Sequence, residues 1–431
     1  MKISTLFTNL ARQMGLMGNV GPEGEPMSDD ERHNSLIVRG EVPLTNLAFG
    51  LGGFFALFAI RLNASNQMVG WLTSGPALLN LLWLIPCGRI VQRSASYKTP
   101  LLAGMVGQRI LLASVAVVPF LPLAWRVPAL IVIASLVTIP QFMWILAFQS
   151  SVSEMFSPRR LTIFLGQRWS LGSLSNVAFN YVVGRLLDII AFPLNFQSVY
   201  FTSGMLSQSS LLLISRLRIP LRASAPARPA ASAGALGVLS VFRDQPAFLR
   251  FELAALAAYM AVYAAQPLFV IYWVRELGAT GAWVGSLNAV YLLGSTLGTF
   301  FWGRWCNLGH DRRNLVIAAI GLMAGYPLLT ATFGRLGPLL LVGVVAGFFG
   351  GGNELQMFNR MVRLSRREER PNYIAVHNFV LSLAGVTAPL ISTSLASYLG
   401  TRTMLALAGV CGLAGAALVY LLGWEKPTET A

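Results

Sequence analysis

Twelve runs of largely apolar residues, each about 20 residues long, constrain this chain more than any other feature of its sequence. A helix that crosses a membrane needs about 20 such residues, because each adds about 1.5 Å and the helix satisfies its own backbone hydrogen bonds. Strands of membrane barrels alternate between polar and apolar residues, whereas these runs are apolar all round. The sequence therefore predicts an all-α polytopic membrane protein. The expected spans are 43–62, 68–87, 99–122, 127–150, 162–184, 196–216, 249–272, 282–302, 313–333, 336–358, 372–397 and 402–423.

Composition supports this class and excludes several others. Hydrophobic residues make up 55% of the chain and charged residues 11%, with a mean hydropathy of +0.61, whereas soluble domains carry roughly 25% charged residues. The net charge of +15 could suggest a nucleic-acid partner, but so apolar a chain has too little polar surface to stay in water. Cys87, Cys306 and Cys411 lack metal-ligand spacing, so we expect no disulfide framework, metal or cofactor.

The cations indicate how the chain is oriented. Of the 32 Lys and Arg residues, 25 lie on the side of the N-terminus, six lie in the opposite loops, and Arg109 lies inside a span. Because short basic loops stay on the cytoplasmic side, both termini are predicted to be cytoplasmic, in the plasma membrane. The segment 1–42 is then a cytoplasmic extension. Its first 17 residues could form an amphipathic helix on the membrane surface, or a frayed tail.

The chain divides into two halves that resemble each other. A segment rich in Pro, Ala and Arg at 217–248 separates a bundle at 43–216 from one at 249–423, and 424–431 forms a cytoplasmic tail. Each half contains six spans. A constant offset of 215 places Leu62, Ala64, Ser65, Val69 and Gly70 on Leu277, Ala279, Thr280, Val284 and Gly285. Internal repeats of this kind are typical of transporters.

A loop motif recurs at equivalent places in the two halves. Gly88 and Arg93 follow the second span, and Gly303 with Arg312 and Arg313 follows the eighth. With twelve spans, cytoplasmic termini and a long central loop, the chain resembles the major facilitator superfamily over nearly its whole length. The motif of that family has an Asp before the Arg and a second Gly two residues after it. Here Gln92 and Ala95 stand at those positions.

The resemblance implies a fold of two pseudo-symmetric six-helix bundles and transport of a small organic solute by alternating access. It also implies that the loop motifs act as gates on the cytoplasmic side. There, glycines let helices approach closely, and Arg93 can pair with Glu154 when that side is shut. The alternative for these charges is that they are solvated loop residues retained for topology.

Polar side chains inside the spans are the candidates for a substrate cavity. Tyr259, Tyr263 and Gln266 recur at i, i+4 and i+7, so they share one face of a helix. An aromatic and weakly charged cavity would suit a neutral or hydrophobic solute, although any single Asn or Tyr could instead be an interhelical hydrogen bonder. The full set is Asn80, Gln141, Trp144, Asn176, Asn180, Tyr259, Tyr263, Gln266, Asn288, Tyr291 and His377.

Three ionisable residues are candidates for coupling transport to an ion. Glu354 follows three glycines, and a partly buried carboxylate can exchange a proton near neutral pH, although pairing with Arg360 or Arg363 at a gate is an alternative. Arg109 and Arg168 lie within spans, where Arg109 is expected to support packing. Coupling to a proton or another cation is left open.

The function expected from the sequence is a secondary active or facilitative transporter that works as a monomer in the lipid bilayer of a prokaryote. A second hypothesis is a non-transporting relative that acts in assembly or in lipid or pigment handling, because the loop motifs are degenerate and embedded charge is sparse. A membrane enzyme is not expected, because His33, His310 and His377 form no HExxH pair and no Walker A lysine exists.

Overall fold

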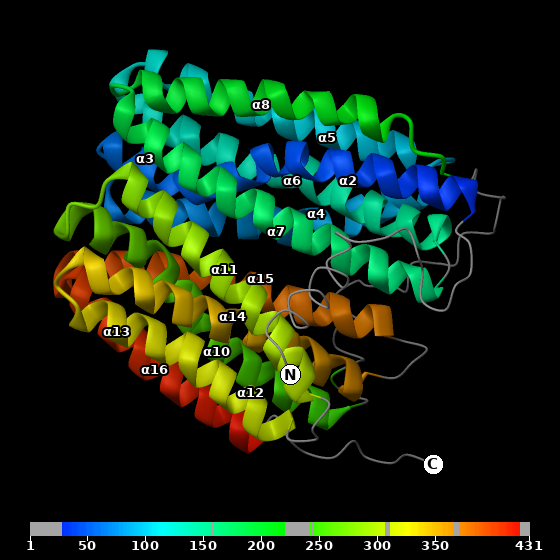
Figure 1. Ribbon diagram of the computed structural model, residues 1–431. Helices are drawn as coiled ribbons and strands as arrows, with labels where there is room; N and C mark the ends of the chain where they lie inside the picture. Colours follow the sequence, from blue (N-terminus) through cyan, green and yellow to red (C-terminus); the bar gives the residue numbers. More distant parts are fainter. Residues whose placement is uncertain are drawn as a thin grey trace, which may run out of the picture.

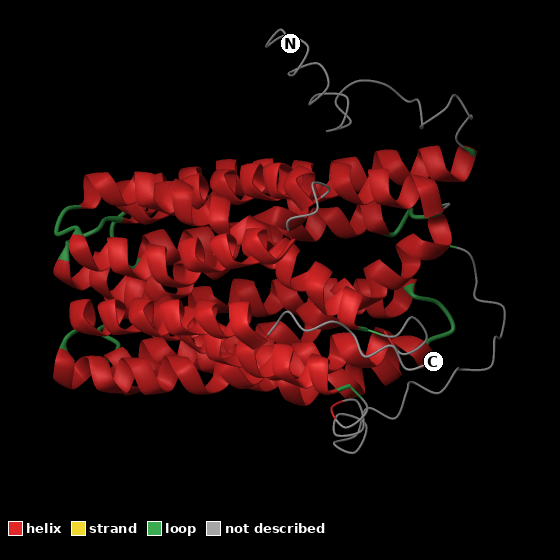
Figure 2. Ribbon diagram, turned by 90° about the horizontal axis from the view of Figure 1, so that it is seen from below, coloured by secondary structure: helices red, strands yellow, loops and turns green. Residues whose placement is uncertain are grey.

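The structure is a computed structural model that describes residues 28–156, 158–219, 242, 245–306, 311–365 and 370–422. The expected N-terminal amphipathic helix, most of the linker and the C-terminal tail lie outside these residues. The described part consists of helices joined by short loops, and its helices form twelve rods that run roughly side by side (Figure 2). The polytopic helical class expected from the sequence is confirmed.

The first six rods form the N-terminal half. In chain order they consist of α2 (Asp29–Phe49) with η2 (Gly50–Phe54) and α3 (Phe55–Arg61), α4 (Asn66–Arg93), α5 (Lys98–Ser114) with η3 (Val115–Phe120), α6 (Leu123–Met155), α7 (Pro158–Ile189) and α8 (Leu194–Ile214).

The last six rods form the C-terminal half. They consist of α10 (Pro246–Ile271) with η4 (Tyr272–Glu276), α11 (Gly281–Cys306), α12 (Asp311–Ala319) with η5 (Ile320–Gly325) and α13 (Tyr326–Thr332), α14 (Leu336–Leu364), α15 (Arg370–Leu399) and α16 (Thr401–Leu422). In the colours of Figure 1, the two halves form two groups, blue to green and green to red.

Ten of these rods are long and apolar enough to cross a membrane, and α7 and α8 are long but more polar. In α8 several hydroxyls are satisfied within the helix: Ser207 donates to the carbonyl of Gly204 at 2.9 Å, and Ser209 donates to the carbonyl of Leu206 at 2.5 Å. A hydroxyl bonded to its own helix is no longer an unsatisfied polar group in lipid. The polarity of α8 is therefore compatible with a membrane span.

The first rod begins earlier than expected. It starts at Asp29 rather than at residue 43, because Ser28 and Glu31 form a capping box in which each side chain accepts from the backbone N–H of the other. Residues 29–42 are thus part of the first rod and pack within the N-terminal half. Glu41, which was expected outside the membrane, is 1% exposed inside the N-terminal half.

The rods define two ends of the molecule. At the hairpin end lie the short connections after α3, η3, α7, η4, α13 and α15, and at the linker end lie the start of α2 and the end of α16. Across the halves, α7 packs against α11 and α4 packs against α15.

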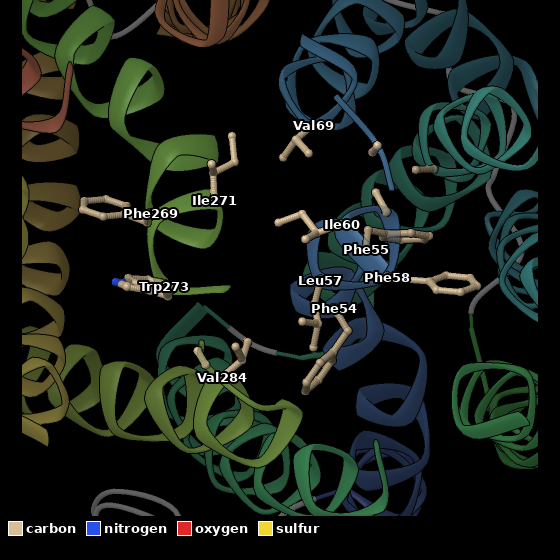
Figure 3. Close-up of a cluster of buried hydrophobic side chains, with 14 of the residues drawn as sticks. Phe54, Phe55, Leu57, Phe58, Ile60, Val69, Phe269, Ile271, Trp273 and Val284 are labelled. Atoms are coloured by element: carbon tan, nitrogen blue, oxygen red, sulfur yellow. The ribbon is translucent and has the colours of Figure 1, made fainter. Parts of the chain in front are cut away.

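Among the described residues, the apolar core joins the halves only on the hairpin side. One cluster combines Phe54, Leu57 and Ile60 with Ile271 and Val284 from the other half (Figure 3). Towards the linker end, two separate clusters replace it, one drawn from residues between 37 and 219 and the other from residues between 242 and 422. The structure is therefore a conformation closed at the hairpin end, with the two halves separate at the linker end.

Polar contacts reinforce the closed end. The Asp188 carboxylate of α7 accepts from the backbone N–H groups of Gly281 and Ala282 at 2.7 and 2.9 Å, at the start of α11. A carboxylate at a helix N-terminus satisfies orphan donors and complements the helix dipole. Arg275 of the C-terminal half donates to the Ala64 carbonyl and to Asn66 Oδ1 of the N-terminal half. These contacts define the hairpin-end latch, formed by Asp188, Gly281, Ala282, Arg275, Ala64 and Asn66.

Candidate functional site

A cavity of about 710 Å³ lies between the halves, directly on the linker side of the shared core. This volume lies within the range of small-molecule sites. Irregular helical turns form part of its wall: Gly52 and Gly53 belong to η2, and Leu322 and Met323 belong to η5. Broken helices at such a place let backbone and side chains approach a solute more closely than a regular helix allows.

Glycines in η2 make room for polar side chains from other helices. A Cβ on Gly50 would lie 2.2 Å from the Phe179 ring and 2.8 Å from Asn176 Oδ1, and one on Gly53 would lie 2.8 Å from Asn288 Nδ2. Real Cβ atoms do not approach neighbours this closely. The glycine run in the first span is thus the sequence signal for the part of the cavity where the two halves meet.

One group of amides forms the cavity wall in the N-terminal half. Gln108 donates from Nε2 to Gln141 Oε1 at 3.2 Å, and its own Oε1 accepts from Trp144 Nε1 at 2.8 Å. Gln108 and Gln141 lie on the wall. Trp144 does not lie on the wall, where it was expected. Its indole donates to Gln108, and its ring packs edge-on against Phe49 inside the N-terminal bundle.

A second group of amides links the halves. Asn180 donates to the carbonyl and to Oδ1 of Asn176, both at 2.9 Å, and its own Oδ1 accepts from Asn288 Nδ2 at 3.3 Å. Asn288 lies on the cavity wall. Asn176 and Asn180 do not, so the expectation that they line the cavity is not met. The Asn176 amide bonds to Asn180 within α7, and Asn180 in turn bonds to Asn288 of α11.

Aromatic side chains form the opposite wall in the C-terminal half. Tyr259 and Tyr263 follow one another along α10 with ring centroids 6.2 Å apart, and Tyr291 and Tyr326 stack at 6.1 Å. Of the residues singled out from the sequence, Tyr259, Tyr263, Gln266 and Tyr291 lie on this wall. Sequence reasoning did not single out Gln108, Trp273 or Tyr326, which also lie on the wall.

Two wall amides are available to a solute. Asn80 and Gln266 lie on the wall and form no hydrogen bond with the described part of the protein. Among the described residues that line the cavity, none is Asp, Glu, Lys, Arg or His. The cavity therefore offers neutral hydrogen-bonding groups and aromatic faces.

Charge is buried beside the cavity, in the interior of each half. In the N-terminal half, Arg168 lies 3.9 Å from Glu41 Oε2 and 4.1 Å above the Phe148 ring. Thr45 donates to Glu41 Oε1. Arg109, fully buried, donates to Thr45 Oγ1 at 3.0 Å and to Ser210 Oγ at 2.6 Å. The expectation that Arg109 supports packing agrees with these contacts.

The C-terminal half contains a corresponding pair. His377 Nδ1 lies 3.0 and 3.1 Å from the two carboxylate oxygens of Glu252, and the imidazole stacks on Phe251 at 6.1 Å. Glu252 is 1% exposed, so its carboxylate is buried inside the bundle. His377 is absent from the cavity wall, where it was expected, because it is bound to Glu252 inside the bundle.

Glu354 lies at the linker side of the aromatic wall. It is close enough to interact electrostatically with Tyr259, Tyr263 and Tyr291. Its suggested gate partner Arg363 instead forms an ion pair with Asp311 of α12. Glu354 has no hydrogen-bond or ion-pair partner in the part of the chain that the structure describes.

The expected gating loops are apart in this conformation. Arg93 and Glu154 are both exposed and do not contact each other. A Cβ on Gly88 would meet nothing within 4 Å, and one on Gly303 would first meet Leu355 at 3.8 Å. Neither glycine is at a close helix contact, because the linker end is open. Arg312 donates to the Tyr420 carbonyl at 2.8 Å, and Arg313 is exposed.

The C-terminal half matches a family model. The model for the Major Facilitator Superfamily matches residues 251–431. No curated protein matches the chain.

Solved structures share the fold over almost the whole chain. A bacterial homologue of the human lysosomal transporter Spinster, in an inward-facing and unoccupied conformation, has 15% sequence identity and a TM-score of 0.68 over 92% of this chain and 98% of its own. A mutant of the nucleoside transporter NupG has 11% identity and a TM-score of 0.73 over 91% and 100%. A POT family transporter bound to a thioalcohol-conjugated peptide has 13% identity and a TM-score of 0.68 over 94% and 98%.

Proposed function

We propose that the chain is a membrane transporter of the major facilitator superfamily, whose family model matches residues 251–431, and that it moves a small, uncharged organic solute by alternating access. The observation that carries this proposal is the cavity between the halves. Its described wall contains amides and aromatic rings and lacks charged groups.

The chemistry of the wall favours one class of solute. An ion taken from water into this cavity would lose its hydration without gaining an opposite charge, which is costly. A neutral solute loses less, because Asn80 and Gln266 can replace its hydrogen bonds with water. A flat face on the solute would pack against Tyr263 and Tyr291.

The names of the structural neighbours suggest compounds to test first. Nucleosides are neutral and carry a flat base with hydrogen-bonding groups, so they fit this wall. An unmodified peptide carries an ammonium and a carboxylate at its ends, and both would lack partners in the described part of the cavity. We therefore place nucleosides and other neutral ring compounds ahead of peptides.

The conformation supports the alternating-access part of the proposal. The shared core and the latch close the hairpin end, while the linker end has separate cores. We propose that the linker end faces the cytoplasm, since 25 of the 32 cations lie on that side. In the plasma membrane this conformation would then be inward-facing.

The preference for uncharged solutes is tested by measuring how matched pairs of solutes stabilise the purified protein against heat. Each pair contains a neutral compound and its charged derivative, such as a nucleoside and its 5′-monophosphate, or a sugar and its phosphate. A ligand that binds the folded protein at 100 times its Kd stabilises by about 2.7 kcal/mol. We expect stabilisation by neutral members only, followed by uptake of the same compounds into proteoliposomes.

A matched variant localises the binding. Gln266→Leu should weaken binding about tenfold, because one hydrogen bond to the solute contributes about 1.4 kcal/mol. Without solute, the variant should have the melting temperature of the wild type, since Gln266 forms no hydrogen bond with the described part of the protein. Preferential stabilisation by the charged members would contradict the proposed substrate class. No flux for any compound, together with a protein that co-purifies in fixed ratio, would favour the non-transporting alternative.

A further inference from the structure

A second cavity, of about 610 Å³, lies at the hairpin end. It shares no wall residue with the central cavity, and its volume also lies within the range of small-molecule sites. Most of its wall comes from the N-terminal half, where the end of α3 meets the end of α7 and the start of α8. Thr280 and Gly281, at the start of α11, complete the wall from the other half.

The cavity lies where the two halves of the repeat differ. Residues 190–193 join α7 to α8, whereas Gly400 alone joins α15 to α16. Ile190, Ala191 and Phe192 of the longer connection lie on the cavity wall. This part of the wall therefore has no counterpart in the C-terminal half.

Hydrogen bonds and ring contacts hold this part of the wall in place. Asn195 at the start of α8 donates from Nδ2 to the Leu187 carbonyl at 2.7 Å, and its Oδ1 accepts from the backbone N–H of Phe196 at 2.8 Å. The Phe192 ring packs edge-on against Phe196 at a centroid distance of 6.2 Å, yet 45% of the surface of Phe192 is exposed. The wall thus offers a preorganised apolar face to a ligand.

Arg61 supplies a positive charge to the wall. It is the last residue of α3, it is exposed, and it forms no hydrogen bond or ion pair with the described part of the protein. At the repeat offset of 215 its counterpart is Glu276, so the cation is specific to this half. A guanidinium keeps its charge at any physiological pH, and its N–H groups match the two oxygens of a carboxylate.

Asp188, the other charged residue of the described wall, limits the charge of the ligand. Its carboxylate already accepts from the backbone N–H groups of Gly281 and Ala282 in the hairpin-end latch. A dianion would bring a second negative charge towards Asp188 without a second cation on the described wall. One guanidinium beside an apolar face therefore matches a ligand with a single carboxylate and an apolar body.

From these observations we propose that the hairpin-end cavity binds a small monocarboxylate with an apolar body, and that the occupied site holds the hairpin end closed. Arg61 binds the carboxylate, and Phe192 packs against the body. The wall is complete only while the start of α11 lies against α7, because Thr280 and Gly281 form part of it. A ligand that binds one conformation better shifts the equilibrium towards that conformation. With the orientation proposed above, the ligand reaches the site from outside the cell.

The experiment measures binding of hydrocinnamate to the purified full chain by isothermal titration calorimetry. The matched neutral probe is hydrocinnamamide, which has nearly the same shape and carries an amide in place of the carboxylate. Arg61→Gln should weaken binding of the carboxylate about tenfold, because it removes a charge-assisted hydrogen bond. Binding of the amide should stay as it is in the wild type.

Three further variants locate the ligand. Arg335→Gln is the matched control, because Arg335 is an exposed cation at the same end that is absent from the cavity wall. Ala191→Trp fills the cavity from an exposed position and should abolish carboxylate binding while Arg61 keeps its charge. Gln266→Leu alters the central cavity. Arg335→Gln and Gln266→Leu should leave carboxylate binding unchanged.

Distance measurements test whether the occupied site keeps this end closed. Spin labels are placed at Leu123 of α6 and Tyr398 of α15, which are exposed at the hairpin end and absent from the wall, in the chain with its native cysteines replaced. A ligand that binds only the closed form lowers the open population about 100-fold at about 100 times its Kd. We expect the short distance to dominate with hydrocinnamate, and a longer distance in its presence would contradict the closing role.

Three binding results would overturn the inference. The first is no binding of hydrocinnamate to the wild type. The second is an equal loss of affinity in Arg61→Gln and Arg335→Gln. The third is carboxylate binding that Gln266→Leu removes, because the ligand would then lie in the central cavity.

Binding at this site does not depend on the proposed function, and the two can fail separately. A failed screen of neutral solutes together with Arg61-dependent binding of hydrocinnamate would count against the proposed substrate class. Binding of neutral solutes without Arg61-dependent binding of hydrocinnamate would count against the hairpin-end site.

Discussion

At the scale of single residues, the charges grouped around Glu41 in the N-terminal half are unequal in number. Two guanidiniums, Arg109 and Arg168, share the single carboxylate of Glu41. Hydroxyls of Thr45 and Ser210 complete the environment of Arg109. A buried cation is unfavourable unless an anion lies nearby, so both guanidiniums need the Glu41 carboxylate.

This inequality predicts that the conservative substitution Glu41→Gln lowers the stability of the protein more than Arg168→Met does. Glu41→Gln keeps the size of the side chain but leaves two guanidiniums without an anion, so it should destabilise the protein by about 3 to 5 kcal/mol. Arg168→Met leaves one guanidinium with one carboxylate and should cost less. The measurement is unfolding of each variant in detergent. A larger loss for Arg168→Met than for Glu41→Gln would contradict this account.

The sequence predicts some site residues and misses others for a physical reason. Tyr259, Tyr263 and Gln266 were found because helical spacing alone places them on one face. Trp144 and Asn180 were expected on the cavity wall but lie off it. A polar side chain inside the bundle can bond to another helix, and sequence spacing does not reveal that partner. Glu41 was missed because the polar start of the first helix hides where the bundle begins.

At the scale of elements, the crossing of α7 and α11 holds the hairpin end together. A Cβ on Gly285 would lie 2.4 Å from the Asn180 carbonyl oxygen and 2.8 Å from Gly184 Cα. Small residues at a membrane helix crossing let the backbones touch, and van der Waals contact then supplies the attraction. The latch at Asp188 lies at the same end of this crossing. Hydropathy predicts the rods themselves but not which of them touch.

Gly285→Ala should open the hairpin end. The added methyl forces α7 and α11 apart by about 1 Å, which loosens the crossing and the latch together. Spin labels at Leu123 of α6 and Tyr398 of α15, both strongly exposed at this end, should report a longer distance. The control is Gly337→Ala in α14, where a Cβ meets nothing within 4 Å. An equal effect in both variants would show that the crossing is not the cause.

At the scale of the whole molecule, the two halves pack together at the hairpin end and separately at the linker end. Each has its own core on the linker side, and they share one core on the hairpin side. Such a division permits rocking about the central cavity without unpacking either half. The repeat in the sequence predicts the two halves. It does not predict which end is closed, because that depends on contacts between halves.

The proposed orientation is tested on one helix. Leu123 and Ser153 lie at opposite ends of α6 and are both exposed. In cells that produce the otherwise cysteine-free protein, Leu123→Cys should react with a membrane-impermeant maleimide, whereas Ser153→Cys should react only after the cells are permeabilised. The physical reason is the retention of basic loops inside the cell. The reverse pattern would place the linker end outside.

The uncharged wall of the cavity also has an electrical consequence. A neutral solute that crosses the membrane between amides and tyrosines carries no current, and the wall that moves around it carries no charge either. Any current recorded during transport would then come from the coupling ion alone. Dividing the charge moved by the solute moved would give the number of ions per cycle directly. The membrane voltage would act on the movement of that ion and not on the binding of the solute.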